Sequence, residues 1–266
     1  MTQPEAIRPE DTWPEWLRDR PNIPLYALEG AERWRMLQGV LLGGVSTALL
    51  FAMLFAERII DPFVLYATSF TFIGGGVIRG RGRPRVSIVG AIAAIAAFGA
   101  NATLFAGDVL HPESWGSFIP AGLVITGIVA STGSAVAGLR NIPSALAPNM
   151  VLGVIGACFA IVASSLVASL PVSSDGPQSG DRFLLAAGSE FTPTVILPAG
   201  VTGLVITNDD MIRHTFVIEG TGNTEPVRVE LPATKARRIE ITLPAGEYRY
   251  FCDLPLREME GVLTVR

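Results

Sequence analysis

The order of apolar and polar positions divides the chain into two unlike parts. Five apolar runs come first and cover residues 36–56, 62–78, 86–107, 118–139 and 150–171. Each run is close to the ~20 residues that a helix needs to cross the hydrocarbon of a bilayer. After residue 180, apolar residues instead occupy alternate positions, as in Val227-x-Val229-x-Leu231, which is typical of strands. We therefore expect an all-α membrane bundle of five transmembrane helices, followed by an all-β domain.

Prolines and glycines mark the boundaries between these parts. Residues 1–35 are rich in proline, which opposes a long regular helix, so we assign them to an N-terminal segment. The five-helix transmembrane domain takes residues 36–171, a flexible linker 172–180 and the β domain 181–266. Within the last, Leu197-Pro-Ala-Gly200 recurs as Leu243-Pro-Ala-Gly246, a sequence suited to turns. Seven or eight short strands predict an antiparallel sandwich or barrel.

Composition agrees with a membrane protein, and charge gives its orientation. The mean hydropathy is +0.44, and the small net charge of −4 gives no indication of a nucleic-acid partner. Four arginines lie together in Arg79-Gly-Arg81-Gly-Arg83-Pro-Arg85, between the second and third runs. Positive loops of this kind stay in the cytoplasm. We therefore expect a multi-pass protein of the cell membrane with a cytoplasmic N-terminus and an extracytoplasmic, periplasmic β domain.

The spans themselves carry small residues and no charge. Gly39-x-x-x-Gly43 and Gly74-Gly-Gly76 are predicted to allow close contacts between helices. No Asp, Glu, Lys, Arg or His falls well inside a span, although ion pathways and proton relays usually need such groups. The sequence therefore favours an anchor or a partner-binding scaffold over a transporter.

Candidate chemistry is concentrated near the end of the chain. The aromatic segment Tyr248-Arg-Tyr-Phe-Cys252 is followed by a short loop and Met259, and His214 lies upstream. Cysteine and methionine provide the soft sulfur ligands that suit copper. The second cysteine, Cys158, lies inside an apolar run, so a disulfide between the two is not expected. His214, Cys252 and Met259 are thus the candidate metal ligands.

These ligands stand in a recurring set of framework motifs: Phe191-x-Pro193, Pro198-x-Gly200, Asn208-Asp209, His214-x-Phe216, Pro244-x-Gly246-x-Tyr248-x-Tyr250-Phe251-Cys252 and Met259-x-Gly261-x-Leu263-Thr264-Val265. The set resembles a cupredoxin, the small blue-copper Greek-key β-sandwich, over residues 181–266. The resemblance implies one copper ion, with His214 as the first histidine ligand, Cys252 as the thiolate and Met259 as the weak axial ligand. The same region also resembles the cupredoxin-like domain of bacterial iron-uptake lipoproteins, which lacks the full blue-copper ligand set.

The resemblance departs at one ligand. The family's second histidine falls three to five residues after the cysteine, where this chain has Pro255, Leu256 and Arg257. One nitrogen and two sulfurs remain, a set that suits Cu(I) better than Cu(II). The candidates for the missing ligand are Asp253, Glu258, water and His111. His111 is included because our predicted topology places the third connection on the same side of the membrane as the β domain.

Two further residues are predicted to support the ligands. Thr215 follows His214 and Asp253 follows Cys252. A hydrogen bond between their side chains would tie the two ligand segments together, as outer-shell partners do at metal sites.

We therefore expect a membrane-anchored copper-binding protein that acts in electron transfer or copper handling, beside a redox or membrane-complex protein partner. No nucleophile–base pair, phosphate loop or carboxylate dyad indicates an enzyme. The alternative is a metal-free cupredoxin fold that serves as an interaction or assembly module of a membrane complex. A transporter subunit is the second alternative.

Overall fold

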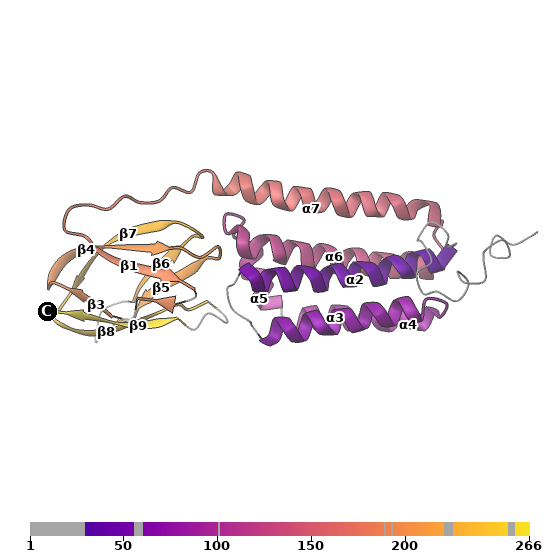
Figure 1. Cartoon of the computed structure of the whole chain (residues 1–266), viewed down its shortest axis with the longest axis horizontal. Helices are drawn as coiled ribbons and strands as arrows, with labels where there is room; N and C mark the ends of the chain where they lie inside the picture. The colour runs from indigo at the N-terminus through magenta and orange to yellow at the C-terminus, as the bar shows by residue number, and fades with distance from the viewer. Residues whose placement is uncertain are drawn as a thin grey trace, which may run out of the picture.

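The computed structural model places a helical part and a β part end to end (Figure 1). It describes residues 30–55, 61–100, 102–188, 190–192, 194–220, 226–254 and 259–266. Most of the predicted N-terminal segment, Pro193 of the Phe191-x-Pro193 motif and the loop at 255–258 therefore lie outside the described residues.

The helical part follows the five apolar runs. Its helices are α2 (Gly30–Phe55), α3 (Asp61–Arg79), α4 (Pro84–Gly99), α5 (Ala102–Val109), α6 (Trp115–Leu139) and α7 (Ala147–Ser169), the last preceded by the 3₁₀ turn η3 (Ser144–Leu146). Three described helical segments are long and apolar enough to cross a membrane: Gly30–Met53, Trp115–Leu139 and Ser144–Ser169. Val64–Arg79 and Pro84–Gly99 are apolar but shorter.

Two boundaries differ from the sequence prediction. Helix α2 begins at Gly30, so residues 30–35 belong to the helix and not to the N-terminal segment. The buried Trp34 ring explains this, because its Nε1 donates a hydrogen bond of 2.9 Å to the carbonyl of Ile142. The third run forms two helices instead of one, since α4 ends at Gly99, a residue type that disfavours helix interiors.

Helix α2 packs against α3 and α6 at the centre of the helical part. Gly39 of α2 and Gly74 of α3 face each other so closely that a Cβ added at Gly39 would lie 2.8 Å from the Gly74 carbonyl oxygen. The predicted close contact is thus confirmed for this pair. Gly43, Gly75 and Gly76 have open space where a Cβ would be.

Nine strands make up the described β part, in two facing sheets. They are β1 (Arg182–Ala187), β2 (Glu190–Phe191), β3 (Thr194–Leu197), β4 (Gly200–Asn208), β5 (His214–Ile218), β6 (Val227–Leu231), β7 (Ala236–Leu243), β8 (Gly246–Phe251) and β9 (Glu260–Val265). One sheet has the order β2-β1-β4-β7 and the other β3-β9-β8-β5-β6. The predicted sandwich is confirmed, but it is not wholly antiparallel, because β1–β4 and β3–β9 are parallel pairs.

The two Pro-Ala-Gly turns have the same construction. Thr202 Oγ1 donates to the carbonyl of Pro198 at 3.1 Å, and the Tyr248 hydroxyl donates to that of Pro244 at 2.9 Å. In each case the hydroxyl lies four residues after the proline. Each turn therefore leads into a strand whose first residues are tied back to it.

The β part touches the helical part through the loop between β4 and β5. The amide of Gly116, at the start of α6, donates to the carbonyl of Met211 at 3.0 Å. Arg213 Nε lies 4.0 Å from Asp108 Oδ1 in α5. This loop leads directly into His214, so the candidate site lies close to the junction of the two parts.

Candidate metal centre

Strands β5 and β8 bring His214 and Cys252 together. The two strands pair antiparallel, with Val217 opposite Phe251, and this register continued by two residues sets Thr215 opposite Asp253. His214 is fully buried at the start of β5, and Cys252 is 7% exposed just after the end of β8. A residue from an upstream strand and one from a late strand thus meet inside the sandwich, as the ligand positions predict.

The His214 ring is held by a buried carboxylate. Its Nε2 lies 2.7 Å from Oδ2 of Asp210, whose other oxygen accepts the amide of Gly188 at 2.7 Å. Asn208 supports the same loop, because its Oδ1 accepts the amide of Asp210 at 3.0 Å and its Nδ2 donates to the carbonyl of Ile212 at 2.9 Å. A carboxylate on one ring nitrogen fixes both the tautomer and the orientation of an imidazole. Bonding to Cys252 or to a metal therefore falls to Nδ1.

The Cys252 thiol is adjacent to polar donors within an apolar core. Its Sγ lies 3.4 Å from both the amide nitrogen and Oγ1 of Thr215. Burial raises the pKa of this thiol, but the neighbouring His214, Thr215 and backbone amides outweigh burial and lower the pKa to about 7. The site thus favours a thiolate, which is the form in which cysteine binds metals.

Met259 is the neighbour of Cys252 across the loop. The Cys252 amide donates to the Met259 carbonyl at 2.9 Å, and the methionine is 2% exposed in the same core cluster. Backbone pairing therefore holds the two sulfur residues together.

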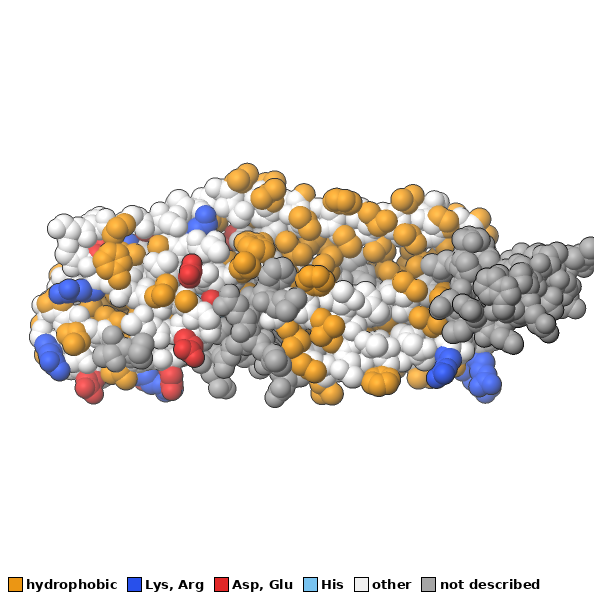
Figure 2. All heavy atoms as spheres, viewed as in Figure 1, with side chains coloured by type: hydrophobic (Ala, Val, Ile, Leu, Met, Phe, Trp, Pro, Cys, Tyr) orange, Lys and Arg blue, Asp and Glu red, His pale blue; other side chains and the backbone are white. Residues whose placement is uncertain are grey.

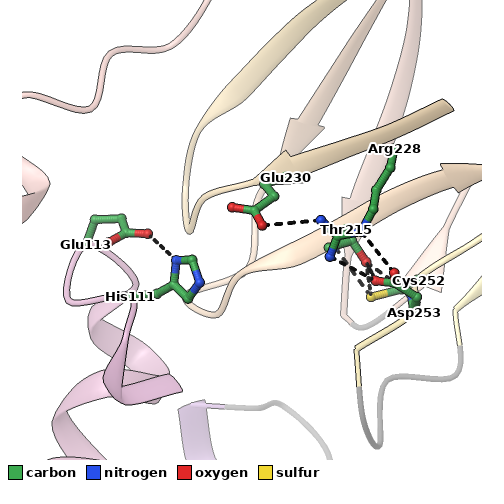
Figure 3. A network of polar contacts seen from close by, with 7 residues as sticks. All are labelled: His111, Glu113, Thr215, Arg228, Glu230, Cys252 and Asp253. Atoms are coloured by element: carbon green, nitrogen blue, oxygen red, sulfur yellow. Dashed lines mark hydrogen bonds and ion pairs between the residues drawn. The ribbon is translucent and has the colours of Figure 1, made fainter. Parts of the chain in front are cut away.

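The predicted hydrogen bond between Thr215 and Asp253 is confirmed. Thr215 Oγ1 donates to Asp253 Oδ1 at 2.5 Å and accepts the Asp253 amide at 3.0 Å. On the outer side, Arg228 Nε donates to Asp253 Oδ2 at 3.0 Å (Figure 3). Burial raises the pKa of Asp253, but the bonds to Arg228 and Thr215 outweigh it and the pKa lies below its usual range. This carboxylate thus serves to join the strands.

His111 does not reach the site. Its Nδ1 pairs with Glu113 at 3.0 Å, and Figure 3 draws this pair well apart from Cys252 and Asp253. The described part of the chain holds no group of three or more His, Cys, Asp or Glu side chains that could bind a metal ion. Glu258 lies outside the described residues. The donors that fit a metal here are one imidazole and one thiolate, with the thioether of Met259 as their neighbour.

Asp210 is the residue of this site that the sequence analysis missed. It stands four residues before His214, and a single carboxylate in a loop has no periodic signature. The available signal was the run Asn208-Asp-Asp210, because Asn and Asp stabilise tight loops through their side chains.

Comparison with known proteins gives one family and several structures. The family model described as "Cupredoxin-like domain" matches residues 159–265, a range that begins inside α7. A copper-containing nitrite reductase from Thermus scotoductus SA-01 is 23% identical, with 36% of this chain and 25% of that chain covered and a TM-score of 0.29. A Cu(I) amicyanin mutant is 17% identical over 36% of this chain and 90% of that chain, with a TM-score of 0.31.

A second, reduced amicyanin mutant is 19% identical, with 36% of this chain and 91% of that chain covered and a TM-score of 0.32. A search of curated proteins finds no match. The chain spans only about a quarter of the nitrite reductase.

Proposed function

We propose that the β part, which lies within the region matched by the model for a cupredoxin-like domain, binds one copper ion through His214 and Cys252, with Met259 as a weak third ligand. The observation that carries the proposal is that the Cys252 thiol and the His214 imidazole meet in the buried core, while Nε2 of the ring is fixed by the buried Asp210.

The donor set supports Cu(I) handling more than electron transfer. A blue-copper centre uses a trigonal plane of two imidazoles and one thiolate, and this chain supplies one imidazole. Two sulfurs and one nitrogen are soft donors that favour the reduced ion. When bound, copper would be the soft, thiophilic cation that these residues hold; Asp210 would keep the His214 ring in place and the apolar core would exclude water.

We further propose that the helical part crosses the membrane five times, with the β part outside and the N-terminal side in the cytoplasm. On the face that Figure 2 shows, hydrophobic side chains are spread over the helical part, and cationic side chains lie at the end remote from the sandwich. Helix α7 supports this, because only 6% of its most apolar window is buried within the protein. In a bilayer that face would meet lipid.

Metal stoichiometry of the full-length protein in detergent tests the copper proposal. Cu(I) and Cu(II) are added separately, with Cys252→Ser as the test variant and Cys158→Ser as its matched control, since Cys158 is the other free cysteine. We expect one Cu(I) per chain in the wild type and in the control, and loss of that ion in Cys252→Ser. Equal binding by both variants, or none by the wild type, would contradict the proposal.

The second candidate function is a metal-free module for interaction or assembly in a membrane complex. The observation in its favour is that the described residues lack a three-residue set of His, Cys, Asp or Glu ligands. In this case Asp210, His214 and Thr215 would form a buried polar network that orders the loop. The wild-type protein would then bind neither copper ion, while retaining its fold.

A further inference from the structure

The turn between α3 and α4 lies at the end of the helical part that is remote from the sandwich (Figure 1) and forms a basic hollow. Its lining residues are Arg79, Gly80, Gly82 and Arg83, and Figure 2 shows cationic side chains projecting at this end. In the sequence, these arginines indicate orientation in the membrane. Their arrangement in space indicates a binding surface.

Among the described acids, the Glu32 carboxylate lies beside this turn, near Gly82, but forms no ion pair with its arginines. None of Arg79, Arg81, Arg83 and Arg85 forms an ion pair with a described Asp or Glu, whereas three arginines of the sandwich, Arg228, Arg238 and Arg249, each pair with two carboxylates. Unpaired guanidinium groups attract an external anion, and their planar forks match the oxygens of a phosphate.

A fifth arginine approaches the turn from α2. Arg35 is only 8% exposed, and its Nη1 donates to the carbonyl of Arg81 at 2.7 Å. Its Nε is buried and has no hydrogen-bond partner among the described residues. A buried cation without a counter-ion is costly. An anion bound at the turn would lower this cost.

The backbone adds to the positive potential. Helix α4 begins at Pro84, and its N-cap residue Arg83 makes no side-chain capping bond. The N-terminus of a helix carries a partial positive charge and favours anions. Gly82 leaves the hollow open, since the one atom near a Cβ added there would be Glu32 Oε1, at 3.8 Å.

We propose that this hollow binds the phosphate group of an anionic lipid headgroup. The proposal rests on the membrane placement given under the proposed function and does not depend on copper. A free phosphate ion offers the same oxygens, so the experiment separates the two sources. Each arginine near a membrane surface raises the affinity for an anionic lipid about fivefold.

Native mass spectrometry of the full-length protein in detergent tests the proposal. The protein is titrated with phosphatidylglycerol and with phosphatidylcholine of the same acyl chains, and then with phosphatidylglycerol in the presence of inorganic phosphate. The test variant is Arg79→Gln/Arg83→Gln. Arg140→Gln is the control, because Arg140 is an exposed cation in the next connection at the same end and does not line the hollow.

We expect the wild type to prefer phosphatidylglycerol and the double variant to lose at least about tenfold of that affinity. Arg140→Gln should change the affinity for phosphatidylglycerol less than about twofold, and Glu32→Gln should raise this affinity. A wild type without preference between the two lipids, or an equal effect of the double variant and Arg140→Gln, would overturn the proposal.

Competition identifies the source of the phosphate. No displacement of lipid by millimolar phosphate supports the headgroup, and displacement supports the same site with soluble phosphate as its ligand. If the double variant fails to fold, the preference of the wild type between the two lipids still tests the proposal. Arg79→Lys/Arg83→Lys then gives the second variant, with an intermediate loss expected because lysine cannot form the bidentate contact. Loss of copper binding would leave all of these results unchanged, so the two proposals fail separately.

Discussion

Asp210 determines how His214 can act. The carboxylate is buried, bonds to Nε2 of the ring and is itself anchored by the Gly188 amide. With Nε2 held in this way, Nδ1 is the ring nitrogen that remains for Cys252 or a metal. The same contact would order a metal ligand or a purely structural histidine, so its effect on metal affinity is informative.

We predict that Asp210→Asn weakens Cu(I) binding by roughly 10–100-fold, the usual cost of losing an outer-shell partner of a ligating histidine. Competition with a Cu(I) chelator measures this on the full-length protein. The control is Asp209→Asn, because Asp209 is exposed and its backbone amide alone makes the bond to Ala186. Equal affinities in the two variants would show that Asp210 has no part in metal binding.

Gly261 makes room for the largest buried ring of the sandwich. The Tyr250 ring packs 5.2 Å from Phe216 and 5.6 Å from Phe191, measured between centroids, and its hydroxyl donates to the Thr192 carbonyl. Burial raises the pKa of Tyr250 to about 12. A Cβ added at Gly261 would overlap this ring.

We therefore predict that Gly261→Ala lowers the free energy of unfolding of the sandwich by about 1–3 kcal/mol, as overpacking usually does. Gly246→Ala is the control, since its added Cβ would meet Tyr248 in ordinary contact at 3.7 Å. Hydrogen exchange of β8 and β9 peptides in the full-length protein measures the loss of unfolding free energy in both variants. A smaller effect at Gly261 than at Gly246 would contradict this account of the packing.

At the scale of elements, the linker is attached to the sandwich more firmly than its composition predicts. The carbonyl of Ser173 accepts a bond from Arg237, and the Asp175 carboxylate accepts the amide of Arg238 at 3.0 Å. Arg238 also forms two hydrogen bonds with Asp181, at 2.9 and 3.1 Å. These contacts hold residues 173–181 along β7, which is the edge strand of its sheet.

The Asp181–Arg238 pair should make the sandwich sensitive to acid. The hydrogen bond from Arg238, with a second from the Gln178 amide, holds the pKa of Asp181 below its ordinary value. A carboxyl whose pKa is lower in the folded state stabilises the fold above its unfolded pKa of about 4, and loses this effect as pH falls through the folded pKa.

We predict that the stability of the wild-type sandwich drops below about pH 4 and that Asp181→Asn flattens this part of the pH dependence. The stability at each pH is measured on β4 and β7 peptides by incubation at that pH, followed by a pulse of hydrogen exchange at one fixed pH. Asp209→Asn should leave the wild-type profile in place. An unchanged profile for Asp181→Asn would refute the role given to the pair.

The elements themselves were largely predictable, and their pairing was not. Apolar length located the helices, and alternation located strands such as β6 and β7. The parallel pairing of β1 with β4 depends on tertiary contacts, which leave no period in the sequence. At the site, His214 and Cys252 were recognisable by residue type, whereas Asp210 acts through a loop geometry that only the fold defines.

At the scale of the whole molecule, the loop from Asp209 to Arg213 connects the two parts. It carries Asp210 on its inner side and contacts the helical part through Met211 and Arg213. The candidate copper site would thus face the end of the helices, with the basic hollow at the opposite end (Figures 1 and 2). A protein inserted in this orientation has chemically different ends on the two sides of the bilayer.

We predict that this orientation is visible by cysteine labelling. In a Cys158→Ser/Cys252→Ser background, a cysteine introduced by Gly176→Cys in the linker should react with an impermeant reagent added outside intact cells. One introduced by Gly82→Cys should react only after the membrane is opened. The reverse pattern, or equal labelling, would contradict the proposed topology.

The proposed site holds a single copper ion between His214 and Cys252. X-ray absorption at the copper edge of the loaded full-length protein tests it most directly, because the first shell reports the ligand atoms. We expect Cu(I) with a sulfur-dominated shell and one imidazole in the wild type and in Cys158→Ser. In Cys252→Ser we expect this signal to be lost. A shell without sulfur in the wild type, or one that the Cys252→Ser change leaves intact, would contradict it.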